Sequence, residues 1–96
     1  MSRVYYSNAA EHDLENIAEY TRSQWGDEQC LAYLALLEQT CEAIIPRNKR
    51  HARRVPQRPD LLRWRCERHV IYFSIVAGGI EVVRILHERM LPLNHL

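Results

Sequence analysis

Two consecutive helical patterns, separated by a single glycine, constrain the fold of this chain more than any other feature of its sequence. Apolar side chains recur at three- and four-residue steps from Ala10 to Trp25 and again from Cys30 to Ile45, which is the period of an amphipathic helix. Gly26 predicts the end of the first helix, because glycine adopts positive φ at little cost. Asp27 is expected to cap the second helix and Pro46 to stop it. So short a connection predicts an antiparallel helical hairpin.

The residues that flank the first helix predict how it begins and what it buries. Arg3 to Ser7 contains the β-branched and aromatic residues that are typical of a short strand. Asn8 is followed three positions later by Glu11, which is the spacing of a helix N-cap. Trp25 ends the apolar stripe of this helix, so we expect its ring to lie in the core.

The second half of the chain predicts a sheet. Residues 47–60 are basic and contain prolines without any periodicity, which indicates a loop. Three strands are expected to follow, at Leu61–Arg65, Arg68–Ala77 and Ile80–His87. Gly78 and Gly79 predict a two-residue hairpin turn between the last two strands. The result is one α+β domain over residues 1–96, in the order β-α-α-β-β-β. The helices should cover one face of an antiparallel sheet and leave the other face open to a partner.

A net charge of +1 conceals a strong asymmetry along the chain. Residues 1–46 carry two basic and eight acidic side chains, a net of −6, whereas residues 47–68 carry nine basic and two acidic ones, a net of +7. A basic cluster of this density favours an acidic protein partner or nucleic acid. The clustered basic residues of the run 47–58 can bind phosphates, but no aromatic residues are interleaved in this run on which bases would stack. We therefore expect no sequence-specific nucleic-acid binding.

Composition excludes several classes of protein. With 47% hydrophobic and 26% charged residues, the chain has the composition of an ordinary folded protein. No stretch approaches the roughly 18 apolar residues of a membrane helix, and residues 1–7 lack the apolar run of a signal peptide, so we expect a cytoplasmic protein without a membrane partner. Cys30, Cys41 and Cys66 have no metal-ligand spacing. Neither a metal nor another cofactor is expected.

Short motifs follow one another in a familiar order through nearly the whole chain. In the helical half they are Ser7, Ala10, Asp13-Leu14, Ile17, Tyr20-Thr21, Trp25-Gly26, Gln29, Tyr33-Leu34 and Leu37. In the sheet half they are Leu62-Arg63, His69 to Phe73, Arg84 to Met90, and His95-Leu96. Together they resemble the ParE toxins of the RelE/ParE superfamily. One departure is Leu91-Pro92, because the family pattern has an aspartate after the methionine.

The resemblance implies a function as well as a fold. Toxins of this family are neutralised by an antitoxin encoded beside them, whose flexible C-terminal segment wraps over the toxin's apolar surface. The ParE branch poisons DNA gyrase, whereas the RelE branch cleaves messenger RNA on the ribosome. We therefore expect the toxic component of a bacterial type II toxin–antitoxin system, with a cognate antitoxin and DNA gyrase as its partners.

The two branches differ in the chemistry that they need. A RelE-type nuclease must activate a ribose 2′-hydroxyl and protonate the leaving oxygen. His87 stands where that branch carries such a group, and Arg63, Arg65 and Arg84 are expected on neighbouring strands. The next residue is Glu88 rather than a tyrosine, so the set is incomplete and no catalytic residue is assigned. Ribosome-dependent mRNA cleavage stays the alternative, as does a non-toxic remnant that only binds its partner.

Two groups of residues are predicted to bind partners. The target is expected to bind His87, Arg89 and Met90, because the tail from His87 to Leu96 ends the sheet and has no evident role in the core. The antitoxin is expected to bind the basic patch, which consists of Arg53, Arg54, Arg63, Trp64 and Arg65.

Overall fold

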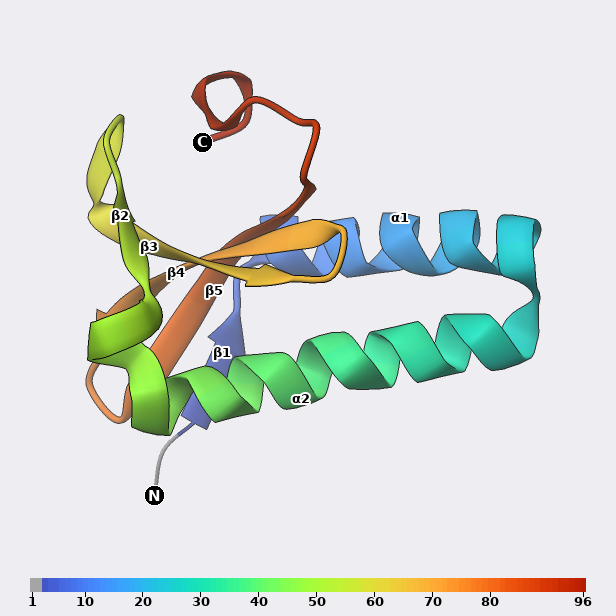
Figure 1. The fold of residues 1–96 in the computed structure, drawn as a ribbon, viewed down its shortest axis with the longest axis horizontal. Coiled ribbons are helices and arrows are strands. Elements are labelled where there is room, and N and C mark those ends of the chain that lie inside the picture. Colours follow the sequence, from blue (N-terminus) through green and yellow to red (C-terminus); the bar gives the residue numbers. More distant parts are fainter. Residues whose placement is uncertain (1–2) are drawn as a thin grey trace.

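The computed structural model describes residues 3–96, with all of their side chains except those of 45–51 and 93. Its elements are β1 (Arg3–Tyr6), α1 (Asn8–Trp25), α2 (Asp27–His51), β2 (Arg53–Val55), β3 (Arg58–Cys66), β4 (His69–Val76), β5 (Gly79–His87) and a short 3-10 helix (Pro92–Asn94) (Figure 1). The strands form one sheet in the order β1-β5-β4-β3-β2. The predicted α+β fold with an N-terminal helical hairpin is confirmed.

Gly26 alone separates the two helices of the hairpin, as predicted. Its φ of 92° and ψ of 172° lie in a region that is essentially restricted to glycine. Its N–H donates to the carbonyl of Arg22 at 2.9 Å, and its own carbonyl accepts from the N–H of Cys30 at 3.1 Å. Asp27 is therefore the first residue of α2 rather than its cap, although its charge still lies at the positive end of the helix dipole.

Ser7, rather than the predicted Asn8, is the N-cap of α1. Its hydroxyl oxygen accepts a hydrogen bond from the N–H of Ala10 at 3.0 Å. The same hydroxyl donates to the carbonyl of Val83 at 2.7 Å. The cap thus satisfies a free backbone donor of the helix and also attaches the start of α1 to β5.

The prediction of a loop at residues 47–60 is wrong. α2 continues through Pro46 to His51, β2 follows at once, and β3 has already begun at Arg58. A proline inside a helix removes one N–H hydrogen bond and costs about 3 kcal/mol, which does not end this helix. The strands are hard to recognise because β2 is only three residues long and lies at the edge of the sheet, where the nearby prolines are tolerated.

β1 makes the sheet mixed rather than purely antiparallel, because all four of its residues pair in parallel with the start of β5. The turn between β4 and β5 lies one residue earlier than predicted, at Ala77 and Gly78, so Gly79 belongs to β5. Gly79 is also where β1 approaches most closely. A Cβ at this position would lie 1.8 Å from the carbonyl oxygen of Arg3, so only glycine fits here.

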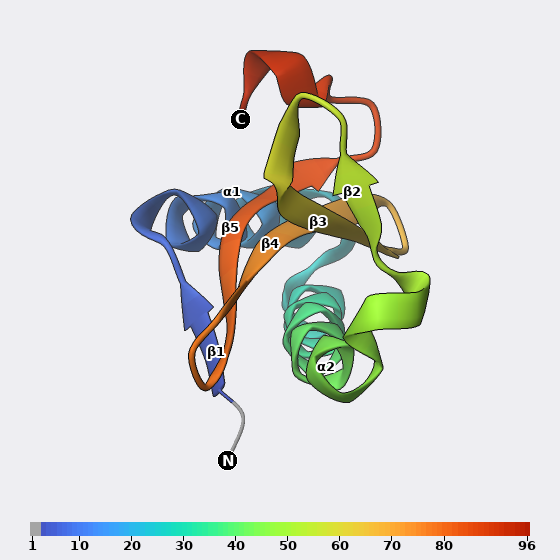
Figure 2. The same ribbon diagram turned by 90° about the vertical axis from the view of Figure 1, so that its left-hand side faces the viewer.

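Clusters of buried side chains lie on both faces of the sheet. The larger cluster fills the space between the sheet and the helices: Ala10, Ile17, Leu37, Cys41, Ile44, Cys66, Ile71, Phe73, Ile80, Val82 and Ile85. The smaller cluster lies on the opposite face: Val55, Leu61, Tyr72 and Leu86, with Leu96 packed against it. The C-terminal residues therefore cover part of the face that was predicted to be open (Figure 2). Among the described residues, neither long helix is both long and apolar enough to cross a membrane.

Candidate functional site: a groove between the helical hairpin and the sheet

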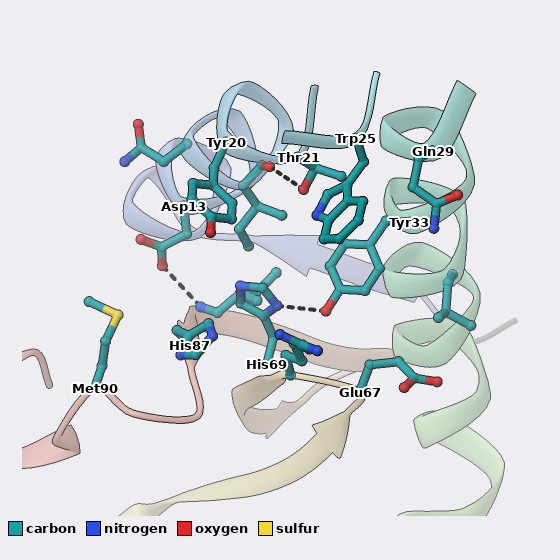
Figure 3. Close-up of a pocket in the computed structure, with 15 residues that line it drawn as sticks. Asp13, Tyr20, Thr21, Trp25, Gln29, Tyr33, Glu67, His69, His87 and Met90 are labelled. Atoms are coloured by element: carbon teal, nitrogen blue, oxygen red, sulfur yellow. Dashed lines mark hydrogen bonds between the residues drawn. The ribbon is translucent and has the colours of Figure 1, made fainter. Parts of the chain in front are cut away.

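A groove of about 760 Å³ lies between the helical hairpin and the ends of β4 and β5. Its walls come from segments far apart in the sequence (Figure 3). The helices contribute Asp13, Asn16, Ile17, Tyr20, Thr21, Trp25, Gln29, Tyr33 and Leu36, and the sheet and the segment after it contribute Glu67, Arg68, His69, Ile85, His87 and Met90.

Exposed apolar side chains form part of the groove wall. Trp25 is 70% exposed and Tyr20 is 66% exposed, so the prediction that Trp25 lies in the core is wrong. The hairpin extends well past the edge of the sheet (Figure 1), and none of the described strands lies beneath the last turn of α1 to cover its apolar stripe. Large apolar side chains that remain exposed and gather on one surface are typical of a protein-binding site.

Three hydrogen-bonded or stacked rings line the groove beneath the hairpin. The hydroxyl of Tyr33 lies 2.6 Å from Nδ1 of His69. The imidazoles of His69 and His87 are direct cross-strand neighbours and meet edge to face, with centroids 5.4 Å apart. Burial, together with the nearby His87, lowers the pKa of His69 to about 4, so this imidazole is neutral near pH 7. Tyr33 was not among the predicted site residues, although its helical spacing between Cys30 and Leu37 indicated an inward-facing position.

A bidentate ion pair joins α1 to β5 beside the groove. Nε and Nη2 of Arg84 donate to the two carboxylate oxygens of Asp13 at 2.8 and 2.9 Å. Asp13 also accepts from the backbone N–H of Ile85 at 2.9 Å (Figure 3). The two side chains are only 10% and 23% exposed. The sequence analysis did not foresee this pair, although Asp13 falls on the same helical stripe as Ala10 and Ile17, where a carboxylate needs a partner.

Of the three arginines that were expected to surround His87, two are engaged by carboxylates, and Arg63 lies on the opposite face of the sheet. Arg84 is held by the carboxylate described above, and Arg65 pairs with Glu88. Nδ1 of His87 accepts a hydrogen bond from the backbone N–H of Arg89 at 3.2 Å, which leaves one ring nitrogen for a ligand. Among the described residues, no group of His, Cys, Asp and Glu side chains could hold a metal ion.

The predicted target-binding residues lie together at the rim of the groove. His87 is half-buried, and Met90 lines the groove and is 38% exposed. A turn keeps these two close, because the N–H of Met90 donates to the carbonyl of His87 at 2.9 Å. Arg89 lies between them in the chain and is exposed.

The segment beyond Met90 has a packing role, contrary to the prediction that the tail takes no part in the core. Nη1 of Arg84 donates to the carbonyl of His95 at 2.8 Å. Nη1 of Arg58 lies 3.5 Å from the carbonyl of Leu96, whose side chain packs on the smaller cluster. Removing residues 90–96 would therefore uncover part of the sheet.

The predicted antitoxin-binding residues do not share one surface. Arg63 and Arg65 alternate along β3 with Trp64, which packs against the helix-side core, so both arginines lie on the other face. Arg53 is the cross-strand partner of Arg63 and shares that face. Arg54 neighbours Arg53 along β2 and therefore lies on the helix side with Trp64. The structure thus brings three of the five residues together.

The fold places the protein in a structural class of small α+β domains that carry a helical hairpin on one face of a mixed five-stranded sheet. A chain in a solved structure of the chromosomal ParDE toxin–antitoxin system from P. aeruginosa has this fold, with a TM-score of 0.75 over 91% of this chain and 96% of that one, at 18% identity. The family model for the ParE toxin of the type II toxin–antitoxin system parDE matches residues 4–92. The chain belongs to this family of ParE toxins.

Curated relatives match over nearly their full length. Toxin ParE of Escherichia coli is 39% identical over 91 residues, which are 94% of this chain and 88% of that protein. Toxin ParE1 of Mycobacterium tuberculosis is 34% identical over 92 residues, which are 93% of this chain and 92% of that protein.

Proposed function

We propose that this toxin acts in the bacterial cytoplasm by binding to DNA gyrase and inhibiting it without chemistry of its own, and that a cognate antitoxin neutralises it. Membership of the ParE family supports gyrase as the target. The groove supports a mode of action by binding, because it presents exposed apolar rings beside polar groups.

The observation that carries binding rather than catalysis is that the groups around His87 do not form a complete acid–base set. Cleavage of RNA needs a cation that stabilises the developing charge on a phosphate. Of the arginines that were expected around His87, Arg65 and Arg84 are paired with carboxylates, and Arg63 lies on the other face of the sheet. His69 is neutral, and its Nδ1 already lies against the Tyr33 hydroxyl. Tyr33 and His69 therefore form a structural contact rather than an acid–base pair.

We place the gyrase contact at His87, Arg89 and Met90. Arg89 and Met90 project from the turn after β5, and Met90 reaches the groove rim. Arginine and methionine are both enriched in the centres of protein interfaces. The face that carries Trp25 and Tyr20 lies across the same groove, so a bound protein segment could contact both walls.

We propose that the antitoxin covers the apolar groove with the flexible segment that is typical of its family. We also predict that an acidic part of this segment contacts the basic patch. Within the patch, the contact is expected on the face that Arg53, Arg63 and Arg65 share. Reversing two of these charges to Glu should slow association and reduce its salt sensitivity. Association rates that match those of the unaltered toxin at low and high salt would remove the basic patch from the antitoxin site.

The test of the target is a pair of assays on purified toxin, namely gyrase supercoiling with trapping of cleaved DNA, and cleavage of ribosome-bound mRNA. We expect gyrase inhibition and intact mRNA. Arg89→Glu and Met90→Glu should each raise the toxin concentration needed for inhibition at least tenfold, roughly the loss of one interface hot spot. The matched control is Arg22→Glu, which reverses an exposed charge on α1. Circular dichroism must show that all variants fold.

Three other outcomes would contradict parts of the proposal. Cleavage of mRNA that disappears in His87→Ala would move the protein to the nuclease branch. Full gyrase inhibition by Arg89→Glu and Met90→Glu would move the target site to the helical hairpin. A folded toxin that binds its antitoxin but affects neither gyrase nor mRNA would be a non-toxic remnant.

A further inference from the structure

Arg53 and Arg63 stand directly opposite each other on β2 and β3. Direct partners in an antiparallel pair have Cβ atoms about 4.5–5.5 Å apart, and like charges at this distance destabilise the pairing. Both side chains belong to exposed residues. Other arginines of these strands bond to Asp60, to Glu88 or to a carbonyl. Arg63 makes a side-chain hydrogen bond with Tyr72, but over the side chains that the structure describes neither Arg53 nor Arg63 has a carboxylate partner.

The surface around this arginine pair offers charge but little apolar area. The apolar side chains beneath it, Val55, Leu61 and Tyr72, are only 1%, 1% and 3% exposed. An amphipathic peptide segment needs apolar pockets for its anchoring side chains. The exposed apolar side chains that could form such pockets lie in the groove, not around the arginine pair. A polyanion needs only accessible positive charge, and β2 is an edge strand that nothing in the described chain covers on its outer side.

We propose that Arg53 and Arg63 bind the phosphate backbone of duplex DNA, so that the toxin holds the DNA on which gyrase acts while the groove side contacts the enzyme. The part that concerns gyrase rests on the function proposed above. A guanidinium group matches a phosphate with two parallel hydrogen bonds. A phosphate between the two arginines also relieves their mutual repulsion, so the unfavourable pair becomes favourable on binding. The contact would be independent of DNA sequence.

The placement of the two surfaces is compatible with simultaneous contacts. β2 and the exposed tip of the helical hairpin lie at opposite ends of the molecule (Figure 1), whose longest extent is 36 Å. Neither arginine takes part in the groove. The proposed DNA contact and the groove therefore use different residues.

The test measures binding of the full-length toxin to a labelled DNA duplex, by fluorescence anisotropy over a range of salt concentrations. The variant is Arg53→Gln/Arg63→Gln. The control is Arg3→Gln/Arg22→Gln, which removes the same charge from exposed residues on the other edge strand and on α1. We expect the variant to bind the duplex roughly five- to tenfold more weakly and to lower the slope of log K against log salt by about 2, because each phosphate contact contributes about 0.9. The control should change neither quantity by more than twofold.

A poly-glutamate peptide serves as the competing acidic partner, and the gyrase assay serves as a second readout. Duplex binding that is the same in variant and control would overturn the proposal. Equal competition by poly-glutamate at matched charge would also overturn it and assign the arginines to an acidic peptide. Weaker duplex binding together with weaker gyrase inhibition in the variant supports the whole proposal. If the unaltered toxin does not inhibit gyrase but binds DNA through these arginines, the phosphate contact stands and the proposed gyrase function fails.

Discussion

Replacing Asp13 by Asn removes one negative charge from the ion pair between α1 and β5 and changes little else in shape. The carboxylate of Asp13 accepts three hydrogen bonds, two from Arg84 and one from the backbone N–H of Ile85. An asparagine keeps one oxygen acceptor but turns an NH₂ group toward the guanidinium donors. Arg84 is then left as a largely buried cation whose remaining partner is the carbonyl of His95.

The expected cost follows from the burial of the pair. Breaking a fully buried ion pair costs about 3–5 kcal/mol, whereas an exposed pair contributes about 0–1 kcal/mol. The side chains of Asp13 and Arg84 are 10% and 23% exposed, which places Asp13→Asn nearer the buried limit, at about 2–4 kcal/mol. The free energy of unfolding of a domain of this size is about 5–15 kcal/mol. The melting temperature should therefore fall by about 10–20 °C.

Equilibrium urea unfolding, followed by far-ultraviolet circular dichroism, measures this cost. The matched control is Asp27→Asn, which breaks the exposed pair between Arg22 and Asp27 and should change the free energy of unfolding by less than about 0.5 kcal/mol. The double variant Asp13→Asn/Arg84→Met should cost clearly less than the sum of its two single variants, because their partners are shared. If Asp13→Asn costs no more than Asp27→Asn, the pair does not hold α1 to the sheet.

Further predictions concern one histidine and three glycines. Because burial lowers the pKa of His69 from 6.5 to about 4, the unfolded chain takes up a proton first, so stability should fall as the pH drops from about 6.5 to about 4. Over this pH range the free energy of unfolding, measured in urea, should fall by about 2 kcal/mol less for His69→Gln than for the unaltered toxin. Equal losses in the two proteins would contradict the lowered pKa of His69. Gly79→Ala places a Cβ 1.8 Å from the carbonyl oxygen of Arg3, so it should lower the free energy of unfolding by about 2 kcal/mol or more and speed amide exchange in β1. In the control Gly78→Ala the new Cβ has no atom within 4 Å, and the cost should be only about 1 kcal/mol. Gly26→Val should cost about 1–3 kcal/mol through its backbone conformation alone, and a melting temperature equal to that of the unaltered toxin would refute this.

The sequence predicted the elements that depend on local patterns. The helical periods and Gly26 predicted the hairpin, and the apolar runs on either side of Gly78-Gly79 predicted β4 and β5. Three-residue β2 and the continuation of α2 through Pro46 were not predictable in this way, because both depend on packing that overrides local preference. The parallel pairing of β1 likewise depends on a partner more than 70 residues away.

The candidate site was predicted only in part for the same reason. His87 and Met90 do lie on the groove, but the contact between Tyr33 and His69 joins two elements whose relative position no local pattern gives. Trp25 shows the opposite error. Its place on an apolar stripe indicated burial, but whether a stripe is covered depends on where the sheet ends.

The parallel pairing of β1 with β5 has a consequence for how the toxin is made. β1 is synthesised more than 70 residues before its partner residues 79–82. At about 5–20 residues per second, several seconds separate the two. During this time Ser7 has no Val83 and Asp13 has no Arg84, so the helical hairpin emerges without the sheet edge that anchors it. The fold can therefore be completed only once residues 79–84 have been synthesised, and until then the helical hairpin has no sheet edge to pack against.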